Sequence, residues 1–262
     1  MNAPEPLATD ADLERRFGGL RRLYGDAGYA RIRAARVAVV GLGGVGSWTV
    51  EALARSGVAE LVLFDLDHVA ESNINRQVQA LTPTVGQSKA LALQQRIALI
   101  HPGCRVRAVE DFVQPDNWPA LLPGPVDVLV DACDQASAKQ ALAAWSIAQH
   151  VPLVCVGAAG GKRQAQRVEV EDLADTTHDP LLASLRQRLR KQGAAPRQGR
   201  MGVRCVFSRE AVQRPEQADC DIATAGAALA CAGYGSSVTV TATFGLVAAG
   251  EALHLLLAQP AP

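Results

Sequence analysis

Short apolar runs and amphipathic stretches alternate along much of the chain. Residues 36–40 form an almost continuous apolar run of the kind found in buried parallel strands, and after Gly46 the apolar positions recur at helical spacing. Residues 61–65 and 126–130 repeat the strand pattern, and residues 137–150 repeat the helical one. This alternation predicts an α/β fold with a doubly wound, Rossmann-like sheet.

Further elements are expected on both sides of this region. Residues 1–35 read as an N-terminal helical arm, residues 166–170 and 203–207 as added strands, and residues 236–258 as an apolar helix. A chain of 262 residues with 48% hydrophobic content can bury a full core. We therefore expect one elaborated domain over residues 36–262, with an added strand and helix extension at its C-terminal end.

The apolar helix invites a second interpretation, because residues 236–250 carry no charge. A membrane span needs about 20 apolar residues, whereas this run contains threonines and continues into Glu251 and His254. A buried helix or a dimer-interface helix is therefore expected. Membrane association is the less favoured alternative.

Six cysteines are dispersed along the chain, and none forms a CxxC pair. This spacing argues against a four-cysteine zinc site and suits reduced thiols. The N-terminus is acidic and contains proline, unlike the basic and then apolar start of a signal peptide. The sequence therefore predicts a cytoplasmic protein.

The segment between the first strand and the first helix is rich in glycine, with Gly41, Gly43, Gly44 and Gly46. Glycine permits a tight turn and close backbone approach, and the N–H groups at a helix N-terminus attract anions. Asp65, at the end of the next strand, stands where such folds hold a ribose hydroxyl. By itself this pattern is typical of a dinucleotide-binding enzyme.

Polar and cationic residues follow Asp65 at a density that a nicotinamide enzyme does not need. Arginine offers a planar fork of donors, lysine a compact charge and amides neutral donors, so the group suits a triphosphate. A solvated loop with a helix-capping asparagine is the alternative. The residues concerned are Asp67, Asn73, Asn75, Arg76, Gln77 and Lys89.

Two carboxylates follow the strand at residues 126–130, in the sequence Asp131-Ala132-Cys133-Asp134. Carboxylates at the carboxyl end of a strand lie in the crevice where ligands bind in open α/β sheets. Magnesium prefers one or two carboxylates together with phosphate oxygens and water, so we expect Asp131 to hold Mg²⁺. Asp134 is expected to cap the next helix or to support the nucleotide site.

Taken in order, these motifs resemble the adenylating domain of the ubiquitin-activating-enzyme superfamily. The motifs are GLGGVGS, FDLD, NINRQ, SKA and DACD, and they extend from about residue 36 to residue 161. Within that superfamily the chain is similar to the tRNA threonylcarbamoyladenosine dehydratases, in the N-terminal motifs RFGG and RLYG and in CAGYG near the C-terminus. The resemblance therefore covers nearly the whole chain.

The resemblance implies an ATP-dependent reaction on the threonyl carboxylate of a modified adenosine beside the tRNA anticodon. The carboxylate attacks the α-phosphate of ATP, pyrophosphate leaves, and a neighbouring nitrogen or oxygen of the substrate captures the acyl-adenylate. The ring closes, and water is lost overall. The residues implied in ATP or Mg²⁺ binding are Gly41, Gly43, Gly44, Gly46, Asp65, Asp67, Asn73, Asn75, Arg76, Gln77, Lys89, Asp131 and Asp134, and Arg76, Lys89 and Asp131 are the catalytic candidates among them.

In many members of the superfamily an N-terminal arginine reaches the ATP bound by the partner subunit. Here Gly19 occupies the position expected for that arginine, so Arg16 or Arg22 is the candidate substitute. Such a contribution requires a homodimer. The alternative is an amphipathic leading helix with solvated arginines.

Seven basic residues and no acid lie between Arg186 and Arg204, in a segment interrupted by Gly193, Pro196 and Gly199. A flexible basic loop of this kind could follow tRNA phosphates. The alternative is a solvated or disordered connection. The formal net charge of zero offers no support for RNA binding by itself.

Cys231 lies among small residues, where a thiolate could form a transient thioester with the acyl-adenylate, and a buried structural thiol is the alternative. The main alternative function is adenylation of the C-terminus of a ubiquitin-like sulfur-carrier protein, which the missing CxxC pairs and the basic segment disfavour. A sulfur-transfer protein is also a candidate partner. A non-catalytic nucleotide-binding adaptor is the third function considered, although Arg76, Lys89 and Asp131 argue against it.

Overall fold

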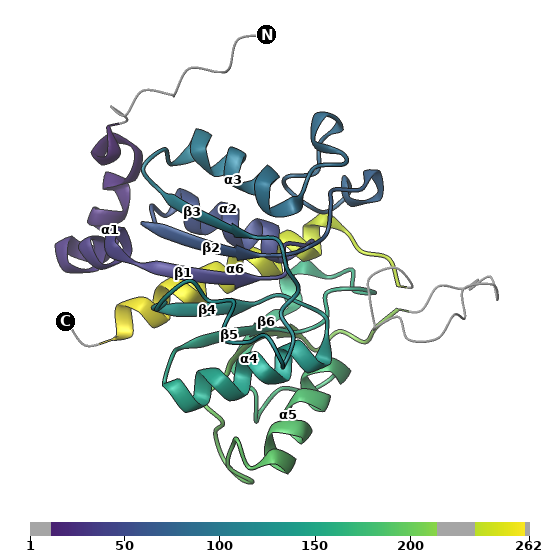
Figure 1. Ribbon diagram of the computed structural model, residues 1–262. Coiled ribbons are helices and arrows are strands. Elements are labelled where there is room, and N and C mark those ends of the chain that lie inside the picture. The colour runs from purple at the N-terminus through teal and green to yellow at the C-terminus, as the bar shows by residue number, and fades with distance from the viewer. Residues whose placement is uncertain (1–11, 214–233, 260–262) are drawn as a thin grey trace.

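The computed structural model describes residues 12–213 and 234–259 (Figure 1). A seven-stranded sheet forms its centre, in the order β3-β2-β1-β4-β5-β7-β6. All neighbouring strands run parallel except β6 and β7, which are antiparallel. The strands are β1 (Arg36–Val40), β2 (Glu60–Phe64), β3 (Arg105–Val109), β4 (Val128–Asp131), β5 (Leu153–Val156), β6 (Val168–Asp172) and β7 (Arg204–Ser208).

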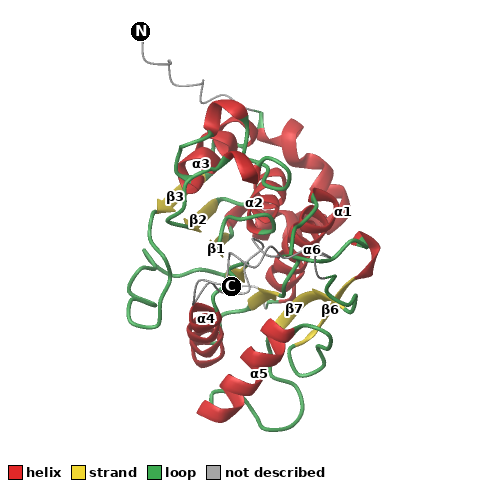
Figure 2. Cartoon of the chain, turned by 90° about the vertical axis from the view of Figure 1, so that its right-hand side faces the viewer, coloured by secondary structure: helices red, strands yellow, loops and turns green. Residues whose placement is uncertain are grey.

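Helices cover both faces of the sheet. Apolar residues of α2, α3 and α6 belong to the core on one face, and those of α4 and α5 belong to the core on the other (Figure 2). A sheet covered in this way is the three-layer arrangement expected of a doubly wound fold. The helices of the described residues are α1 (Leu13–Ala34), α2 (Gly46–Arg55), α3 (Lys89–Ile100), α4 (Ala136–Gln149), α5 (Pro180–Gln192) and α6 (Val238–Ala258).

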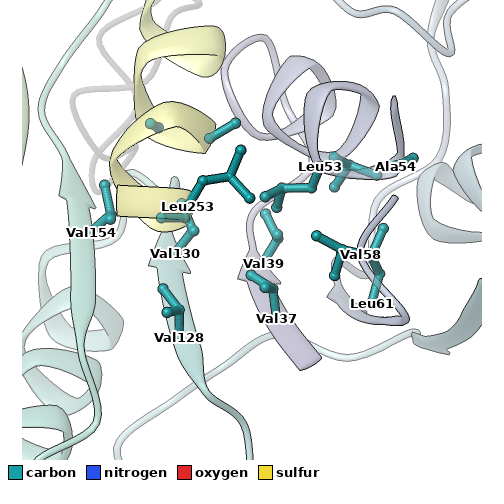
Figure 3. Packing of buried hydrophobic residues seen from close by; sticks show 14 of the residues in the cluster. Val37, Val39, Leu53, Ala54, Val58, Leu61, Val128, Val130, Val154 and Leu253 are labelled. Carbon is teal, nitrogen blue, oxygen red and sulfur yellow. The ribbon is translucent and has the colours of Figure 1, made fainter. Parts of the chain in front are cut away.

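The central strands are apolar on both faces because both faces are covered. Val37 and Val39 of β1 share one core cluster with Val128 and Val130 of β4 and with Leu253 of α6 (Figure 3). The four valines are fully buried, and burial of a side chain of this size contributes about 1.5–3 kcal/mol. The uninterrupted apolar runs therefore place β1 and β4 at the middle of the sheet.

The carboxyl ends of β1 and β4 are adjacent, since Val40 pairs with Asp131. From β1 the chain continues outward through β2 to β3, and it then returns to β4 on the other side of β1. Connections that diverge from such a reversal leave a crevice, where ligands bind in open α/β sheets. The glycine loop (residues 41–46) and the turn at residues 131–134 follow these two strand ends.

The predicted α/β fold, with a doubly wound Rossmann-like sheet and an added C-terminal strand and helix, is confirmed. Strand β3 is not among the predicted strands, although Arg105–Val109 alternates charged and apolar residues as a half-buried strand at the edge of a sheet does. The first residues of the predicted strand at 166–170 form part of a 3₁₀ turn, Ala165–Arg167, and β6 begins at Val168. The division between an N-terminal arm and a domain that starts at residue 36 stays a prediction.

Helix α6 packs against the rest of the described chain. It is long and apolar enough to cross a membrane by length and composition, and half of its most apolar window is buried inside the structure. A Cβ at Gly245 would lie 2.5 Å from the carbonyl oxygen of Val45, so the backbone of α6 approaches the start of α2 closely. The contacts are those of a core helix, which is one of the two roles expected for it.

The basic segment at residues 186–204 is only partly a loop. Its first residues belong to α5, which Asp179 caps by accepting a hydrogen bond from the backbone N–H of Leu182. The Arg186 guanidinium donates to the backbone carbonyls of Leu173 and Thr176, and therefore holds the neighbouring chain. The expectation of a flexible loop from Arg186 onward is wrong for the helical part, because α5 buries one leucine face and is capped at both ends.

Helix α1 packs against the C-terminal end of α3 around a buried imidazole. His101 is 1% exposed, and its Nε2 atom lies 2.8 Å from a guanidinium nitrogen of Arg33. The ring of Phe17 meets the imidazole edge to face at 4.8 Å. Burial, aided by the positive charges of Arg33 and Arg16, lowers the pKa of His101 to about 4. The imidazole is therefore neutral at physiological pH.

We expect His101 to make the folded state more sensitive to acid. Between about pH 4 and pH 6.5 the unfolded chain binds a proton at this residue and the folded chain does not, so stability rises with pH across this window and falls as the pH drops. The loss attributable to His101 should be about 1–3 kcal/mol. Urea denaturation of wild type and His101→Gln between pH 7 and pH 4 measures it. Equal pH slopes in the two proteins would contradict the assignment.

Candidate active site

A cavity of about 540 Å³ opens at the carboxyl ends of β1, β2, β4 and β5. The crevice expected from the strand order therefore contains space for a ligand. Its walls include most of the residues predicted from the sequence. These are Gly41, Gly43, Gly44, Asp65, Asp67, Asn73, Arg76, Gln77, Lys89 and Asp134. Among the predicted residues that the structure describes, Gly46, Asn75, Asp131, Arg16 and Arg22 do not line the cavity.

The glycine loop needs its glycines for two different reasons. Gly41 has a positive φ of 84°, and a Cβ there would lie 2.8 Å from the backbone nitrogen of Cys133. A Cβ at Gly46 would lie 1.8 Å from the carbonyl oxygen of Gly41. At these two positions the backbone of the turn lies so close to other backbone atoms that a side chain does not fit. A Cβ at Gly43, by contrast, would meet no other atom of the described residues within 4 Å, although Gly43 lines the cavity.

The different surroundings of Gly43 and Gly46 allow the effect of a substitution on ligand binding to be measured apart from its effect on folding. We expect Gly43→Ala to fold with an unchanged melting temperature and to bind ATP about 5- to 150-fold more weakly, since overpacking against a ligand costs roughly 1–3 kcal/mol. Gly46→Ala should instead lower the melting temperature, because its methyl group meets the protein backbone. Calorimetric titration with ATP, paired with thermal unfolding, measures both effects. Wild-type ATP affinity in Gly43→Ala would show that no ligand approaches this glycine.

Asp65 stands at the end of β2 beneath the glycine loop. Its two oxygens accept backbone hydrogen bonds from Leu42 at 2.6 Å and from Asp67 at 2.9 Å. Burial raises the pKa of Asp65, and the positive charge of Lys89 opposes this shift. Lys89 is 6% exposed, and its Nζ lies 2.7 Å from Asp67 and 4.0 Å from Asp65. A single ammonium group therefore forms ion pairs with two carboxylates at the cavity wall.

The segment after β2 is held by its backbone and amide groups. The indole of Trp48 donates to the carbonyl oxygen of Arg76 at 3.0 Å, which fixes the position of that arginine on the loop. Asn73 accepts a hydrogen bond from the backbone of Ala70 and supports the turn. Asn75 lies outside the cavity, because its amide donates to Ser236 and its oxygen accepts from Arg76. Its role in the structure is to anchor the arginine.

The structure contradicts the assignment of a metal ion to Asp131. This carboxylate is fully buried, and its Oδ2 atom lies 2.9 Å from the equally buried ammonium of Lys139. Its Oδ1 atom accepts hydrogen bonds from the backbone N–H of Cys133 at 3.1 Å and from its thiol at 2.9 Å. Both oxygens thus face protein groups below the cavity floor, and a metal ion in the cavity cannot reach them.

Asp134 takes the place in the cavity that was expected for Asp131. It is exposed and lines the cavity next to Gln135. The expected helix cap is not observed, since Gln135 and not Asp134 stands at the N-cap position of α4, without a side-chain hydrogen bond. The Asp134 carboxylate is therefore the one at this strand end that a ligand can reach.

Several cavity residues were not predicted from the sequence. The loop after β5, residues 157–160, contributes one wall, and Asp179 fixes it by accepting a hydrogen bond from Ala158 at 2.8 Å. Asp111 and Phe112, which follow β3, contribute another. The sequence Gly-Ala-Ala-Gly directly after an apolar run was an available signal for the first of these walls, whereas the second depends on recognising β3.

The remaining predicted residues lie away from this cavity. Arg16 donates at 2.6 Å to the carbonyl of Ile100 at the end of α3, beside a second cavity of about 490 Å³. Arg22 is exposed on α1 next to Leu23, which is 69% exposed. Cys231 lies outside the described residues, so its predicted thioester chemistry stays a prediction.

The charges that the described residues contribute to the cavity lining do not balance a triphosphate. Their cations are Arg76 and Lys89, and Lys89 is already paired with Asp67. The phosphates of a bound nucleoside triphosphate and the carboxylates of the lining are all negative, and they repel one another strongly in a low dielectric. Binding therefore needs further positive charge from outside this lining. The carboxylates of the lining are Asp65, Asp67, Asp111 and Asp134.

Fold and site together define a nucleotide-binding α/β protein, and the chain belongs to the ThiF family, whose model matches residues 16–262. It is 42% identical to the tRNA threonylcarbamoyladenosine dehydratase of Escherichia coli, over 94% of this chain and 95% of that protein. Identity to the protein of the same name from Haemophilus influenzae is 38%, over 96% of this chain and 97% of that protein. The predicted resemblance is confirmed along nearly the whole chain.

Solved structures agree with the sequence comparison. Crystal structures of E. coli tRNA N6-threonylcarbamoyladenosine dehydratase in complex with ATP and with AMP match this fold with a TM-score of 0.84. The match has 40% identity and covers 96% of this chain and 98% of that chain. The fold is thus shared over almost its full length.

Proposed function

We propose that this chain is an ATP-dependent tRNA threonylcarbamoyladenosine dehydratase, which adenylates the threonyl carboxylate and lets the substrate close its own ring. One observation carries the proposal: similarity to two dehydratases runs over nearly the whole chain and coincides with a cavity that gathers the predicted nucleotide-binding residues. Similarity of that extent favours the dehydratase over the activation of a sulfur-carrier protein.

ATP would lie along the carboxyl edge of the sheet. We assign the ribose to Asp65 at the end of β2 and the phosphates to the glycine loop, Arg76 and Lys89, all of which line the cavity. The threonyl carboxylate then approaches the α-phosphate from the side of β4 and β5, where residues 157–160 form the wall. In this arrangement the carboxylate oxygen and the α-phosphate would meet between the cationic residues on one side and the loop at residues 157–160 on the other.

The cation that completes the charge balance is proposed to be Mg²⁺, with Asp134 as its protein ligand. Among the described residues there is no cluster of three or more histidine, cysteine or acidic side chains that could hold a metal ion. Magnesium needs only one or two carboxylates besides phosphate oxygens and water, so the exposed carboxylate of Asp134 fits it. When bound, Mg²⁺ would neutralise phosphate charge as pyrophosphate departs.

The protein's own work is positioning and charge stabilisation. A carboxylate lacks a good leaving group, and adenylation supplies one in AMP. Ring closure is intramolecular and can use effective molarities of roughly 10⁵ M or more when the reacting groups are well oriented. Arg76 and Lys89 stabilise the charge that develops during phosphoryl transfer.

We further propose that α5 and the loop after it contact tRNA in the cytoplasm. Arg188, Lys191, Arg197 and Arg200 are exposed, and the segment contains no acid to oppose phosphate binding. Arg186 and Arg204 are engaged within the chain and are excluded from this surface. A sulfur-transfer protein remains a proposed additional partner.

Mass spectrometry of nucleosides tests the function directly. Incubation of tRNA carrying threonylcarbamoyladenosine with the protein, Mg²⁺ and ATP should remove one water from that nucleoside and form AMP rather than ADP. Omission of ATP is the control and should leave the nucleoside unchanged. Unmodified tRNA, together with ATP–pyrophosphate exchange stimulated by a carrier protein that ends in Gly-Gly, would move the function to the sulfur-carrier alternative.

A homodimer in which Arg22 reaches the partner's ATP is also proposed. Arg16 is engaged with the end of α3, whereas Arg22 is exposed beside exposed apolar groups, as an interface arginine would be. Arg22→Ala should lower the adenylation rate by about 10-fold, as expected from the loss of a cation near phosphate.

Mixed dimers show whether this arginine acts across the interface. Co-expression of Arg22→Ala and Lys89→Ala chains gives dimers that carry one site with both groups intact, so about a quarter of wild-type activity should return, given random pairing of two chains in a twofold dimer. Differently tagged chains allow the mixed species to be purified. Activity no higher than the average of the two parent variants would exclude a contribution from the partner.

A further inference from the structure

An ion pair lies beneath the cavity floor without touching the cavity. Asp131 and Lys139 are both 0% exposed, and their charged atoms are 2.9 Å apart. Burial alone would lower the pKa of Lys139, but the adjacent Asp131 carboxylate outweighs it and raises this pKa. Lys139 is therefore charged, and it lies against the Asp131 carboxylate. Pairs of this kind contribute little net stability, because removing two charges from water costs about as much as their attraction returns.

The position of Lys139 gives no advantage to its own helix. It lies in the first turn of α4, where the helix dipole presents its positive end and a cation is unfavourable. An apolar residue would fill the same buried space without this disadvantage. The contacts that the ammonium group makes outside α4 therefore account for a lysine at this position.

Those contacts join two of the loops that border the cavity. Lys139 Nζ donates to the Asp131 carboxylate at the end of β4 and to the carbonyl oxygen of Val156 at the end of β5, each at 2.9 Å. The other Asp131 oxygen accepts from the Cys133 backbone and thereby closes the turn that leads to Asp134. Val156 directly precedes the loop at residues 157–160.

The same turn supports the glycine loop. A Cβ placed on Gly41 would approach the backbone of Ala132 and Cys133 to within 2.9 Å, so the two segments are in close contact. A displacement of the turn after β4 would consequently shift the glycine loop as well. Three walls of the cavity thus depend on the conformation that Asp131 and Lys139 hold.

We propose that Asp131 and Lys139 are a positioning pair, which sets the direction of Asp134 and ties its turn to the loop after β5. Neither residue touches the nucleotide or the metal ion. The inference rests on the proposed function, since it concerns the Asp134 carboxylate as a ligand of Mg²⁺ bound with ATP. It gives the Asp131 carboxylate a role at this strand end although that carboxylate cannot reach the cavity.

The test uses neutral variants, so that an unpaired buried charge does not prevent folding. The double variant Asp131→Asn/Lys139→Met removes both charges and keeps similar volumes. ATP affinity is measured by calorimetric titration with and without Mg²⁺, on the full-length protein. The quantity compared is the gain in ATP affinity that Mg²⁺ produces. Thermal unfolding of each variant is recorded in parallel.

The positioning pair predicts a specific pattern. The double variant should lose the Mg²⁺-dependent gain by about 10-fold or more, as for groups that orient a metal ligand, and this loss comes in addition to any loss of ATP affinity measured without Mg²⁺. Asp134→Asn should show the same loss. Adding the double variant to Asp134→Asn should cause no further loss of this gain, because the pair affects Mg²⁺ binding through that carboxylate.

The matched control is another charged cluster that lies outside the cavity lining. Glu51 bridges α2 and α3 by pairing with Arg96 at 2.7 Å. The variant Glu51→Gln/Arg96→Met should lower the melting temperature and leave the Mg²⁺-dependent gain unchanged. A similar loss of this gain in the control would mean that general destabilisation causes the effect, which would overturn the proposal.

Two other outcomes would also overturn the inference, and they can be told apart. A wild-type gain in the double variant, or a loss that adds to that of Asp134→Asn, would reject the positioning role while leaving the proposed function intact. An unchanged gain in Asp134→Asn itself would reject Asp134 as the ligand. The dehydration assay on tRNA decides independently whether the proposed function survives.

Discussion

Replacement of Lys89 by alanine is expected to lower the rate of adenylation by at least about 10²-fold, as is typical when one preorganised charge is removed from a phosphoryl-transfer site. Two effects act in the same direction. The transition state loses a cation, and the carboxylates of Asp65 and Asp67 lose the ammonium that lies 4.0 Å and 2.7 Å from them. The cavity then carries Arg76 as its one lining cation among the described residues.

The measurement is AMP formation under saturating ATP and substrate, with thermal unfolding as a check of the fold. Asp67→Asn is the matched variant, because it breaks the same ion pair and keeps the lysine. It should retain activity within about 10-fold of wild type, since the loss of an outer carboxylate leaves the cation near the phosphates. Equal losses in Asp67→Asn and Lys89→Ala would assign the effect to the ion pair and refute a direct role of the Lys89 charge.

The glycine loop and Asp65 could be recognised from sequence because their signature is local. A strand, a tight turn and a helix follow one another within a short stretch, and each glycine has a steric reason that depends on its near neighbours. The close approach of Gly46 to the Gly41 carbonyl is one example. The cationic residues between Asn73 and Lys89 could be recognised for the same reason, since their types match a triphosphate wherever the loop lies.

The burial of Asp131 could not be predicted from its neighbours in the sequence. The sequence placed it correctly at a strand end, but a strand points successive side chains to opposite faces, and the face occupied by Asp131 is covered by α4. Its partner Lys139 meets it only after that helix folds back over the sheet. Only such tertiary contacts distinguish a buried carboxylate from an exposed one, so the sequence pattern assigned the cavity-facing position to Asp131, whereas Asp134 lines the cavity.

The β5 side of the cavity illustrates a different limit. Residues 157–160 carry no charged group, so their residue types do not mark them as part of a site. Their contribution is space: a Cβ on Gly157 would lie 2.3 Å from the Asp179 carboxylate, so the loop passes close to the start of α5. Walls made from backbone and small side chains give little signal by residue type, although their glycines after an apolar strand mark a turn.

Loss of the Lys139 charge should produce the largest change in stability among single substitutions in this region. Lys139→Met leaves the Asp131 carboxylate fully buried without its cation, and breaking a buried pair in this way costs about 3–5 kcal/mol. The melting temperature should fall by roughly 6–20 °C, given about 2–4 °C per kcal/mol for a domain near this size. Denaturant unfolding and thermal unfolding both measure this loss.

The rescue by a second substitution distinguishes a buried charge from lost packing. Adding Asp131→Asn to Lys139→Met removes the unpaired charge, so most of the lost stability should return and leave a deficit of about 1–2 kcal/mol from the weakened hydrogen bonds. If packing of the lysine chain were responsible instead, the second change would lower stability further. A double-mutant cycle between the two positions should therefore give a coupling energy of about 2 kcal/mol or more, because the residues are in direct contact within one network.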